Sequence, residues 1–354
     1  MVSAGTYILG AAALAAVLLS LGFSAFRLRQ RLLPAWDGAP ARLVEAVVGI
    51  ALLIWLSEIL GTFNLFYAWT LVAASLLLTG VTTLFLSGSA ASPAGGVGGR
   101  TPPPGGCGGQ GPDPGIAPSL CPEQRAGQGG RPPTTGPAGL DVASLITIAA
   151  VALVFAHWGL TTKDALDRGI FNFDSLWYHM PFAVEMVQSH SVTGLHYTDT
   201  VFTNWFYPQN SELLHATGIL LTERDTLSLF LNFGFLGLAF LAAWCIGRPY
   251  GRGHLSVVAV AIVLEAHTLV VREPGAAKND ILTAALLLAA VAILVNAWGI
   301  RRELRPGWPL AAAGLAVGLA AGTKFTVMAM AGALTVAVIV LTPAGRRWAA
   351  AAWW

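Results

Sequence analysis

The chain contains nine apolar runs that are long enough to cross the hydrocarbon core of a bilayer, which is about 30 Å thick. They lie at about residues 6–25, 43–62, 65–87, 142–161, 226–247, 255–271, 281–300, 308–323 and 325–342. Only 11% of the 354 residues are charged, against about 25% in an ordinary soluble domain. Because lipid must then cover the apolar surface, we expect an all-α polytopic membrane protein with about nine transmembrane helices.

The basic residues predict how the spans are oriented. If the spans alternate in direction, fourteen of the twenty Lys and Arg residues fall on one side of the membrane. Cytoplasmic loops are enriched in Lys and Arg, so we assign that side to the cytoplasm. The long loop 162–225 then faces outside. Arg greatly outnumbers Lys, and Ala and Gly are abundant. This bias is typical of a GC-rich bacterial gene, so we expect the bacterial cytoplasmic membrane.

Residues 88–141 interrupt the series of spans. Gly and Pro dominate this segment and it shows no apolar period, which predicts a disordered cytoplasmic linker. The linker would divide N-terminal transmembrane helices at 1–87 from a transmembrane core at 142–354. The three cysteines of the chain have no metal-ligand spacing, and two of them lie in this segment.

Within the outer loop, residues 170–210 gather Asp, Glu, His, Trp and Tyr side chains between apolar spans. Such a loop is typical of a functional surface at the membrane boundary. The segment after Asp174 has a helical period, and we expect this helix to lie in the interface with its apolar side in lipid. Its apolar face carries Trp177, Pro181, Val184 and Val187, and another face carries His179, Phe182 and Glu185.

A second short helix is expected at 209–222. Its apolar run is too short to span the bilayer, so we interpret it as a juxtamembrane or partly embedded helix. Trp205 and Tyr207 precede it and fit the aromatic belt of a membrane interface.

Two carboxylates and two lysines fall on the outer side. Asp174 and Asp280 each precede or begin a helix, so each suits either an N-cap or a reacting carboxylate. Lys278 has the pattern of an ordinary solvated charge. Lys324 lies between two apolar runs and suits either a snorkelling lysine or a point charge that holds a phosphate. Two carboxylates at one membrane face can act as a base and as a metal or acceptor ligand.

Other ionisable residues give weaker signals. Four residues of the outer loop can bind metals, but they lack the tight spacing of a metal site, so we expect hydrogen bonds within the loop. These are His179, His190, His196 and Asp199. Three more ionisable residues fall within predicted spans, where they suit pairing between helices or a transport pathway. These are Glu58, Glu265 and His267.

Three short motifs follow one another along the chain: FDSLWYH in the first outer loop, AKND at the start of a later span, and GTKFT after a small-residue span. Their order and shared sidedness resemble the GT-C superfamily of membrane glycosyltransferases, which includes protein mannosyltransferases and aminoarabinose transferases. The resemblance covers about residues 142–342. It implies a GT-C-like fold, in which an extracytoplasmic loop contains juxtamembrane helices.

The resemblance also implies a function. It implies an enzyme that moves a sugar from a polyprenyl-phosphate donor to a hydroxyl of a cell-envelope or protein acceptor on the extracytoplasmic face. Position by position, Asp174 matches the catalytic base, Asp280 matches a second acidic residue of the site, and Lys324 matches a residue that binds donor phosphate. The candidates for substrate binding are then His179, Glu185, Lys278, Trp205 and Tyr207.

Two features depart from the pattern of the superfamily. Many relatives carry two adjacent acidic residues in the first loop, whereas here Ser175 follows Asp174, so a divalent metal is compatible with the motif but not required by it. The chain also ends soon after a span, as a short member or a truncated, non-catalytic protein would.

The alternative to an enzyme is a transporter or flippase of a lipid-linked or polar substrate. That class predicts inverted repeats and helices broken at midplane, and the sequence shows no convincing internal repeat. A formal net charge of +2 gives no reason to expect a nucleic acid partner.

Overall fold

The computed structural model describes residues 4–87, 141–194, 204–301 and 303–354. Within these ranges the regular elements are helices and there is no β-strand, so the all-α class is confirmed. The predicted linker 88–141 lies outside the described residues except for Asp141. That residue caps the helix that follows, because its carboxylate accepts a hydrogen bond from the Ser144 amide at 2.8 Å.

Thirteen α-helices are joined by short turns and by five brief 3₁₀ or π segments in the described part of the chain. The α-helices are α1 Ala4–Leu32, α2 Gly38–Thr62, α3 Ala68–Ser87, α4 Val142–Arg168, α5 Met180–Ser189, α6 Asn210–Thr222, α7 Thr226–Gly247, α8 Gly253–Leu264, α9 His267–Arg272, α10 Asp280–Arg301, α11 Trp308–Ala321, α12 Met328–Leu341 and α13 Arg347–Trp353. The brief segments are η1 Ser175–His179, which is a π-helix, and the 3₁₀ turns η2 Asn204–Phe206, η3 Arg248–Tyr250, η4 Phe325–Val327 and η5 Ala344–Arg346.

Among the residues that the structure describes, five helices are long and apolar enough to cross a membrane, namely α1, α2, α4, α7 and α10. This is the arrangement of an integral membrane protein. The other four predicted spans correspond to shorter apolar helices within the described residues, at Ala68–Leu84, Gly253–Leu264, Trp308–Ala321 and Phe325–Leu341. The predicted span 255–271 is interrupted, because α8 ends at Leu264 and α9 begins at His267. A total of nine spans therefore stays a prediction.

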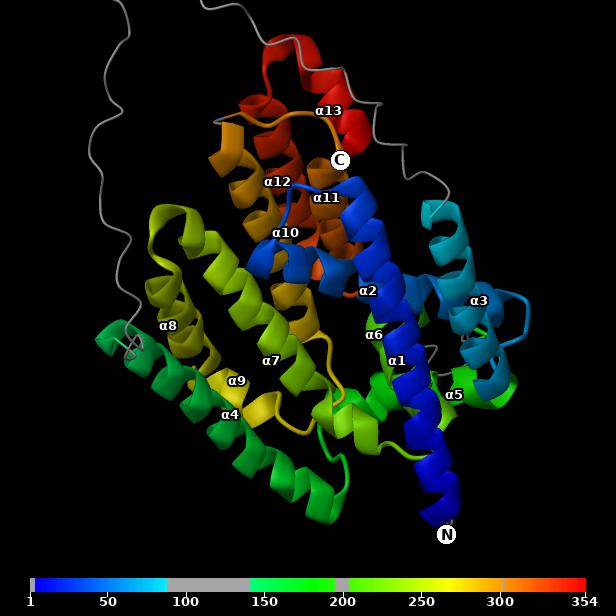
Figure 1. Cartoon of the computed structure of the whole chain (residues 1–354). Helices are drawn as coiled ribbons and strands as arrows, with labels where there is room; N and C mark the ends of the chain where they lie inside the picture. Colours follow the sequence, from blue (N-terminus) through cyan, green and yellow to red (C-terminus); the bar gives the residue numbers. More distant parts are fainter. Residues whose placement is uncertain (1–3, 88–140, 195–203, 302) are drawn as a thin grey trace, which may run out of the picture.

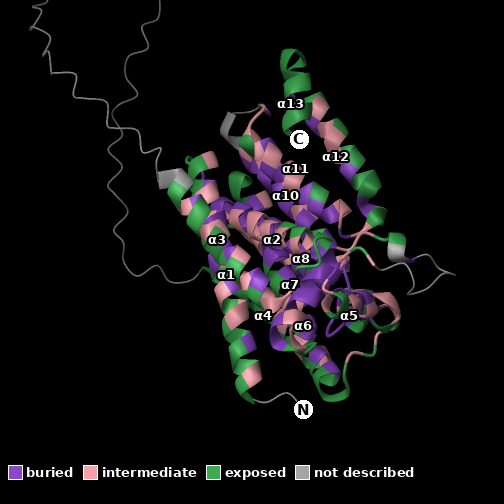
Figure 2. Ribbon diagram, turned by 90° about the vertical axis from the view of Figure 1, so that its right-hand side faces the viewer, coloured by how far each residue is buried: buried purple, intermediate pink, exposed green. Residues whose placement is uncertain are grey.

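The helices of both predicted domains pack into one body (Figure 1). One continuous hydrophobic core contains residues from the N-terminal helices and from the part of the chain after residue 141. Helix α1 packs against α3 and α6, and α2 packs against α7, α10 and α11. Figure 2 shows buried residues gathered in α6 and α7, and exposed residues along α12 and α13. The exposed large apolar side chains of α4, among them Leu153 and Leu160, are suited to contact with lipid.

The two short helices of the outer loop differ from the sequence-based expectation. Helix α6 is buried along almost its whole length inside the protein, and its juxtamembrane or partly embedded position stays a prediction. The segment before α5 is a π turn, and the face with His179 and Phe182 is fully buried against protein. Helices α5 and α6 pack on each other. The face that was expected to contact lipid is only half-buried. The reason is that α6 covers the helix on its polar side.

Candidate functional site

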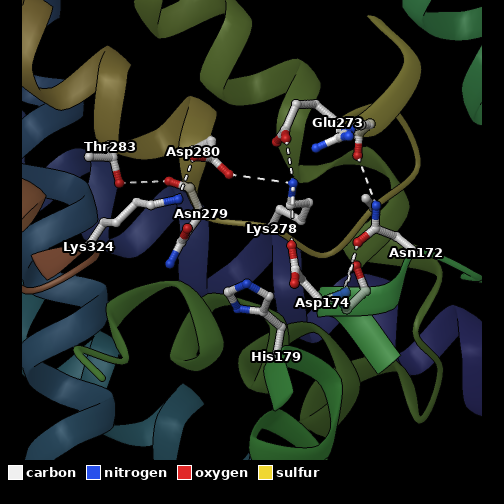
Figure 3. Close-up of polar contacts among 12 residues, drawn as sticks. Asn172, Asp174, His179, Glu273, Lys278, Asn279, Asp280, Thr283 and Lys324 are labelled. Carbon is white, nitrogen blue, oxygen red and sulfur yellow. Dashed lines mark hydrogen bonds and ion pairs between the residues drawn. The ribbon is translucent and has the colours of Figure 1, made fainter. Parts of the chain in front are cut away.

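A buried lysine lies at the centre of a cluster of charged residues. Nζ of Lys278 lies 2.8 Å from Oε1 of Glu273, 3.6 Å from Oδ2 of Asp280 and 3.7 Å from Oδ2 of Asp174 (Figure 3). Lys278 is only 8% exposed, so the expectation of a solvated lysine is wrong. A buried ammonium needs anionic partners, and the chain supplies them from the loop after α4, the loop after α9 and the start of α10.

The loop between α9 and α10 is held in place by contacts to three other elements. Gly275 has φ +66 and packs so closely on α4 that a Cβ there would lie 2.6 Å from Cβ of Ala165. Nδ2 of Asn232 on α7 donates to the carbonyl of Glu273 at 2.8 Å. Oγ of Ser175 in η1 donates to the carbonyl of Ala277 at 3.1 Å. These contacts fix the direction in which Lys278 leaves the backbone.

Asp174 is not the N-cap of the helix that it precedes. It already has helical φ and ψ angles and its side chain makes no capping hydrogen bond. Asn172 makes the capping hydrogen bond instead, since its Oδ1 accepts from the Asp174 amide at 3.1 Å. Nδ2 of Asn172 donates to the carbonyl of Arg272 at 3.2 Å. The Asp174 carboxylate is thereby free to face Lys278, with 41% of its side chain exposed.

Asp280 and Lys324 form a direct ion pair at the same end of the bundle. Nζ of Lys324 lies 2.5 Å from Oδ1 of Asp280, and both side chains are about one-third exposed, at 31% and 34%. Lys324 thus has the anionic partner that a lysine between two apolar runs needs. The residues that precede Asp280 and Lys324 are also hydrogen-bonded to each other, since Nδ2 of Asn279 donates to the carbonyl of Thr323 at 3.0 Å.

The charges of this cluster depend on one another. Burial raises the pKa of the Glu273 carboxyl above its usual range, and the hydrogen bond from Lys278 opposes this shift. Burial lowers the pKa of Lys278, but the bond to Glu273 and the nearby charges of Asp280 and Asp174 outweigh it, so the pKa lies above its ordinary value. The ammonium of Lys278 therefore stays charged at neutral pH and keeps the carboxylates around it in place.

A second polar group lies buried beside this cluster. Nδ1 of His179 and Oε1 of Glu212 share a short hydrogen bond, and both side chains are almost fully buried. Several buried atoms have no hydrogen-bond partner within the described part of the chain: Nε2 of His179, Oε2 of Glu212, Oγ of Ser211, and both ring nitrogens of His215. A buried polar atom that is left unsatisfied costs about 1–3 kcal/mol of stability in general. Burial, together with the charge of His179, lowers the pKa of His215 to about 3.

The remaining candidates for substrate binding are more dispersed. Glu185 on α5 is half-buried and makes no ion pair with the described residues of the cluster. Tyr207 is half-exposed and stacks edge-on against Tyr178 with ring centroids 5.8 Å apart. Burial, with the nearby charges of Asp174 and Glu212, raises the pKa of Tyr178 well above its usual range. The side chain of Trp205 lies outside the described part of the structure.

The weaker sequence signals find other partners. His190 stacks on Tyr67 with ring centroids 3.8 Å apart, and Glu265 pairs with His157 on α4 at 2.7 Å, which is the expected helix-to-helix pairing. His196 and Asp199 lie outside the described residues. No group of three or more His, Cys, Asp or Glu among the described residues is arranged to hold a metal ion. The place between the carboxylates of the cluster is taken by the ammonium of Lys278.

Sequence reasoning missed Glu273, Glu212 and His215. Glu273 carried no signal beyond its residue type. Glu212 and His215 lie three residues apart in a helix, a spacing that places both on one face, and this was the signal that was available. No protein-family model, curated protein or solved structure matches this chain.

Proposed function

We propose that the chain is a membrane glycosyltransferase, which moves a sugar from a polyprenyl-phosphate donor to an acceptor hydroxyl at the end of the bundle that carries Lys278. The observation that carries the proposal is the convergence of the Asp174 and Asp280 carboxylates on the ammonium of Lys278, beside the partly exposed Lys324. These four residues were the acidic and basic candidates of the three motifs, and they come from three separate segments of the chain.

The chemistry assigns a role to each exposed group. The carboxylate of Asp174 accepts the proton of the acceptor hydroxyl, and the acceptor oxygen then forms a bond to the anomeric carbon of the sugar. The bond between that carbon and the phosphate oxygen breaks, and its electron pair stays on the phosphate, which leaves attached to its lipid. The ammonium of Lys324 lies where it can stabilise the negative charge of the leaving phosphate. The reaction inverts the anomeric centre, since it is a single displacement.

The position of the charged groups favours transfer over transport. Asp280 is the first residue of α10, Lys324 lies between α11 and η4, and Asp174 lies just before η1. All three therefore lie at helix ends. A transporter binds its substrate near the middle of the bilayer, between broken helices. Reactive groups at the end of the bundle suit a reaction at the membrane surface, where a lipid-linked donor and a polar acceptor meet.

The experiment that tests the proposal is sugar transfer from radiolabelled polyprenyl-phosphate sugars in membranes that contain the full chain. We expect Asp174→Asn to lower turnover by about 10²–10⁴-fold at unchanged expression, the usual contribution of a general base. Asp164→Asn is the matched control, because Asp164 is exposed near the end of α4. Equal turnover in Asp174→Asn and wild type would remove Asp174 from the mechanism. A wild-type chain that transfers none of a panel of sugars would refute the proposal.

The proposal also places this end of the bundle outside the bacterial cytoplasmic membrane. Two exposed positions at opposite ends of the bundle test that orientation, namely Arg168 at the end of α4 and Tyr250 in η3. In a chain whose native cysteines are replaced by Ser, a membrane-impermeant maleimide should label Arg168→Cys in intact cells. It should label Tyr250→Cys only after lysis. The reverse pattern would place the site in the cytoplasm.

A further inference from the structure

The pair formed by His179 and Glu212 has no task in the reaction described so far. Its carboxylate and imidazole are almost fully buried, at about 2% and 1% side-chain exposure. Glu212 lies on α6 and His179 ends the π turn η1, so the hydrogen bond joins two different elements. A buried carboxylate is costly unless a cation or a proton accompanies it. Among the described residues, the partner of Glu212 is His179.

The π turn brings His179 closer to the side of its segment that carries Asp174 than an α-helical turn would. The amide of Met180 donates to the carbonyl of Ser175, which is the i→i+5 hydrogen bond of a π-helix. In that geometry residues five apart lie closer together around the axis than in an α-helix, where they point about 140° apart. Asp174 and His179 are five residues apart. Figure 3 shows both side chains in the same group of polar residues as Lys278 and Asp280, with no hydrogen bond between the imidazole and the Asp174 carboxylate.

The two ring nitrogens of His179 have different surroundings. Nδ1 is bound to Glu212, and Nε2 is buried without a partner among the described residues. A hydrogen bond at one ring nitrogen sets what the other can do. When Nδ1 donates to the Glu212 carboxylate, Nε2 of the neutral ring is an acceptor, and one more proton at Nε2 produces an imidazolium whose charge Glu212 balances.

We propose that His179, held by Glu212, is a proton-accepting group coupled to Asp174. The inference rests on the proposed function, in which it receives the proton that Asp174 removes from the acceptor hydroxyl. Nε2 of His179 and the Asp174 carboxylate are not hydrogen-bonded in the structure, so the two groups must come within hydrogen-bond distance for this step. The bond between that proton and the Asp174 oxygen then breaks, a bond to Nε2 of His179 forms, and Asp174 returns to the carboxylate that the next cycle needs. The proton leaves the imidazolium for bulk water after the products depart. His179 acts through Asp174 and does not contact the sugar.

The other titratable side chains near His179 are less suited to accept the proton from Asp174. His215 lies beside it on α6, but its pKa is lowered to about 3, and Tyr178 is held in its neutral form. Lys278 stays charged within its own cluster. The titratable and charged groups that face His179 are Glu212 and His215 on α6, Asp174 and Tyr178 on its own segment, Tyr207 before α6, and Lys278 and Asp280 at the start of α10.

The first test measures the proton directly and needs no substrate. The full chain, labelled with ¹⁵N-histidine and held in lipid nanodiscs, reports by NMR the fraction of His179 that carries a proton at Nε2. The His179 signal is assigned by its loss in His179→Gln. At a pH where about half of this signal is protonated in wild type, Asp174→Asn and Glu212→Gln should each lower the fraction, since each removes an anion beside the imidazolium. The exposed residues Asp164 and Glu223 give the matched controls Asp164→Asn and Glu223→Gln, which should leave it unchanged.

Two results of this measurement would overturn the inference. One is a protonated fraction that is the same in Asp174→Asn as in wild type, because the two groups would then not be coupled. The other is a His179 signal that keeps one protonation state between about pH 5 and pH 9, because such a group cannot take up and release a proton near neutral pH. The His190 signal, which arises far from this pair, reports that each variant is folded.

The second test separates a proton role from a structural one. In His179→Asn the side-chain amide reaches the place of Nδ1 and can keep a hydrogen bond to Glu212. In His179→Gln the amide reaches the place of Nε2. Neither amide takes up a proton, so both variants should lower sugar turnover by about 10²-fold or more while the KM for the donor is unchanged. His190→Gln is the control. A His179→Asn variant with wild-type turnover would reduce His179 to a structural partner of Glu212.

The two tests also separate this inference from the proposed function. If wild type transfers no sugar but the protonation of His179 responds to Asp174→Asn, the glycosyltransferase proposal fails and the coupled proton site stands. If wild type transfers sugar and His179 does not respond, the proton site fails and the glycosyltransferase proposal stands.

Discussion

Nζ of Lys278 lies 3.7 Å from Oδ2 of Asp174, and this contact joins the loop after α4 to the loop before α10. The same ammonium contacts Glu273 and Asp280. One buried positive charge therefore keeps three carboxylates together that would otherwise repel one another. The side chains of Asp174 and Asp280 are partly exposed, whereas those of Lys278 and Glu273 are buried. A substrate at this end of the bundle could therefore reach the first two carboxylates.

Replacing Lys278 should destabilise the protein. In Lys278→Met the buried Glu273 carboxylate loses its partner, and breaking a buried ion pair in this way costs about 3–5 kcal/mol. We expect the low end of that range, because Asp174 and Asp280 are partly exposed and water can solvate them. The measurement is the free energy of unfolding in detergent micelles.

A second substitution and a control make this prediction specific. Adding Glu273→Gln to Lys278→Met should recover part of the loss, since the unpaired buried carboxylate is then removed. Lys163→Met is the matched control, because Lys163 forms an exposed ion pair with Asp167 on α4 and should cause no measurable change. Equal losses in Lys278→Met and Lys163→Met would show that the buried cluster does not stabilise the fold.

The Asp280–Lys324 pair predicts that binding and chemistry can be separated. Lys324→Gln removes the exposed cation beside Asp280, so it should weaken binding of a polyprenyl phosphate by about 10-fold, the loss of one charge-assisted contact. Asp280→Asn removes an anion from the same place and frees Lys324, so it should not weaken this binding even if turnover falls. Equilibrium binding of the polyprenyl phosphate to each variant in nanodiscs tests both statements. Tighter binding in Lys324→Gln than in wild type would contradict the assignment.

A close contact between α6 and the end of α11 predicts a sensitive glycine. A Cβ at Gly322 would lie 2.5 Å from Nδ2 of Asn210, and that amide also donates to the carbonyl of Leu319 at 3.2 Å. Gly322→Ala should therefore push Asn210 aside, cost about 1–3 kcal/mol and displace Lys324, which follows two residues later. Gly318→Ala, one turn earlier, meets nothing within 4 Å, and should be neutral or slightly stabilising in the helix. Similar thermal stability for the two variants would show that this contact does not fix the segment.

The sequence was sufficient to predict the class of fold, because long apolar runs with few charges have few alternatives to membrane helices. It was less informative about where helices break. The interruption after Leu264 falls at Glu265 and His267, and the many apolar residues on both sides made 255–271 read as one span despite these two. The burial of α6 was equally hidden, since a short apolar helix with Glu212 and His215 can lie in an interface or inside a protein.

The candidate site shows the same limit. Alternation of the spans placed Asp174, Lys278, Asp280 and Lys324 on one side, and the structure brings these four together. Sidedness does not say which residues touch, so the burial of Lys278 was not predicted. In an α-helix His179 and Asp174 would point about 140° apart around the axis. The π turn η1, which the sequence did not predict, brings the two residues closer.

The buried His215 predicts a loss of stability in acid. Its pKa is about 3 in the folded protein, against about 6.5 in an unfolded chain. Between these values the unfolded state binds a proton that the folded state does not, so stability falls as the pH falls, by about 1.4 kcal/mol per pH unit. His215→Met keeps a flexible side chain of similar size and removes the titrating ring. The variant should lose less stability than wild type when the pH falls from about 6.5 to 4.5.

Between about pH 7.5 and 8.5 His215 is neutral in both states, so the two proteins should change in parallel there, which is the internal control. Unfolding free energies in detergent across both ranges test this, and equal slopes in the acid range would mean that His215 takes up a proton within the folded protein.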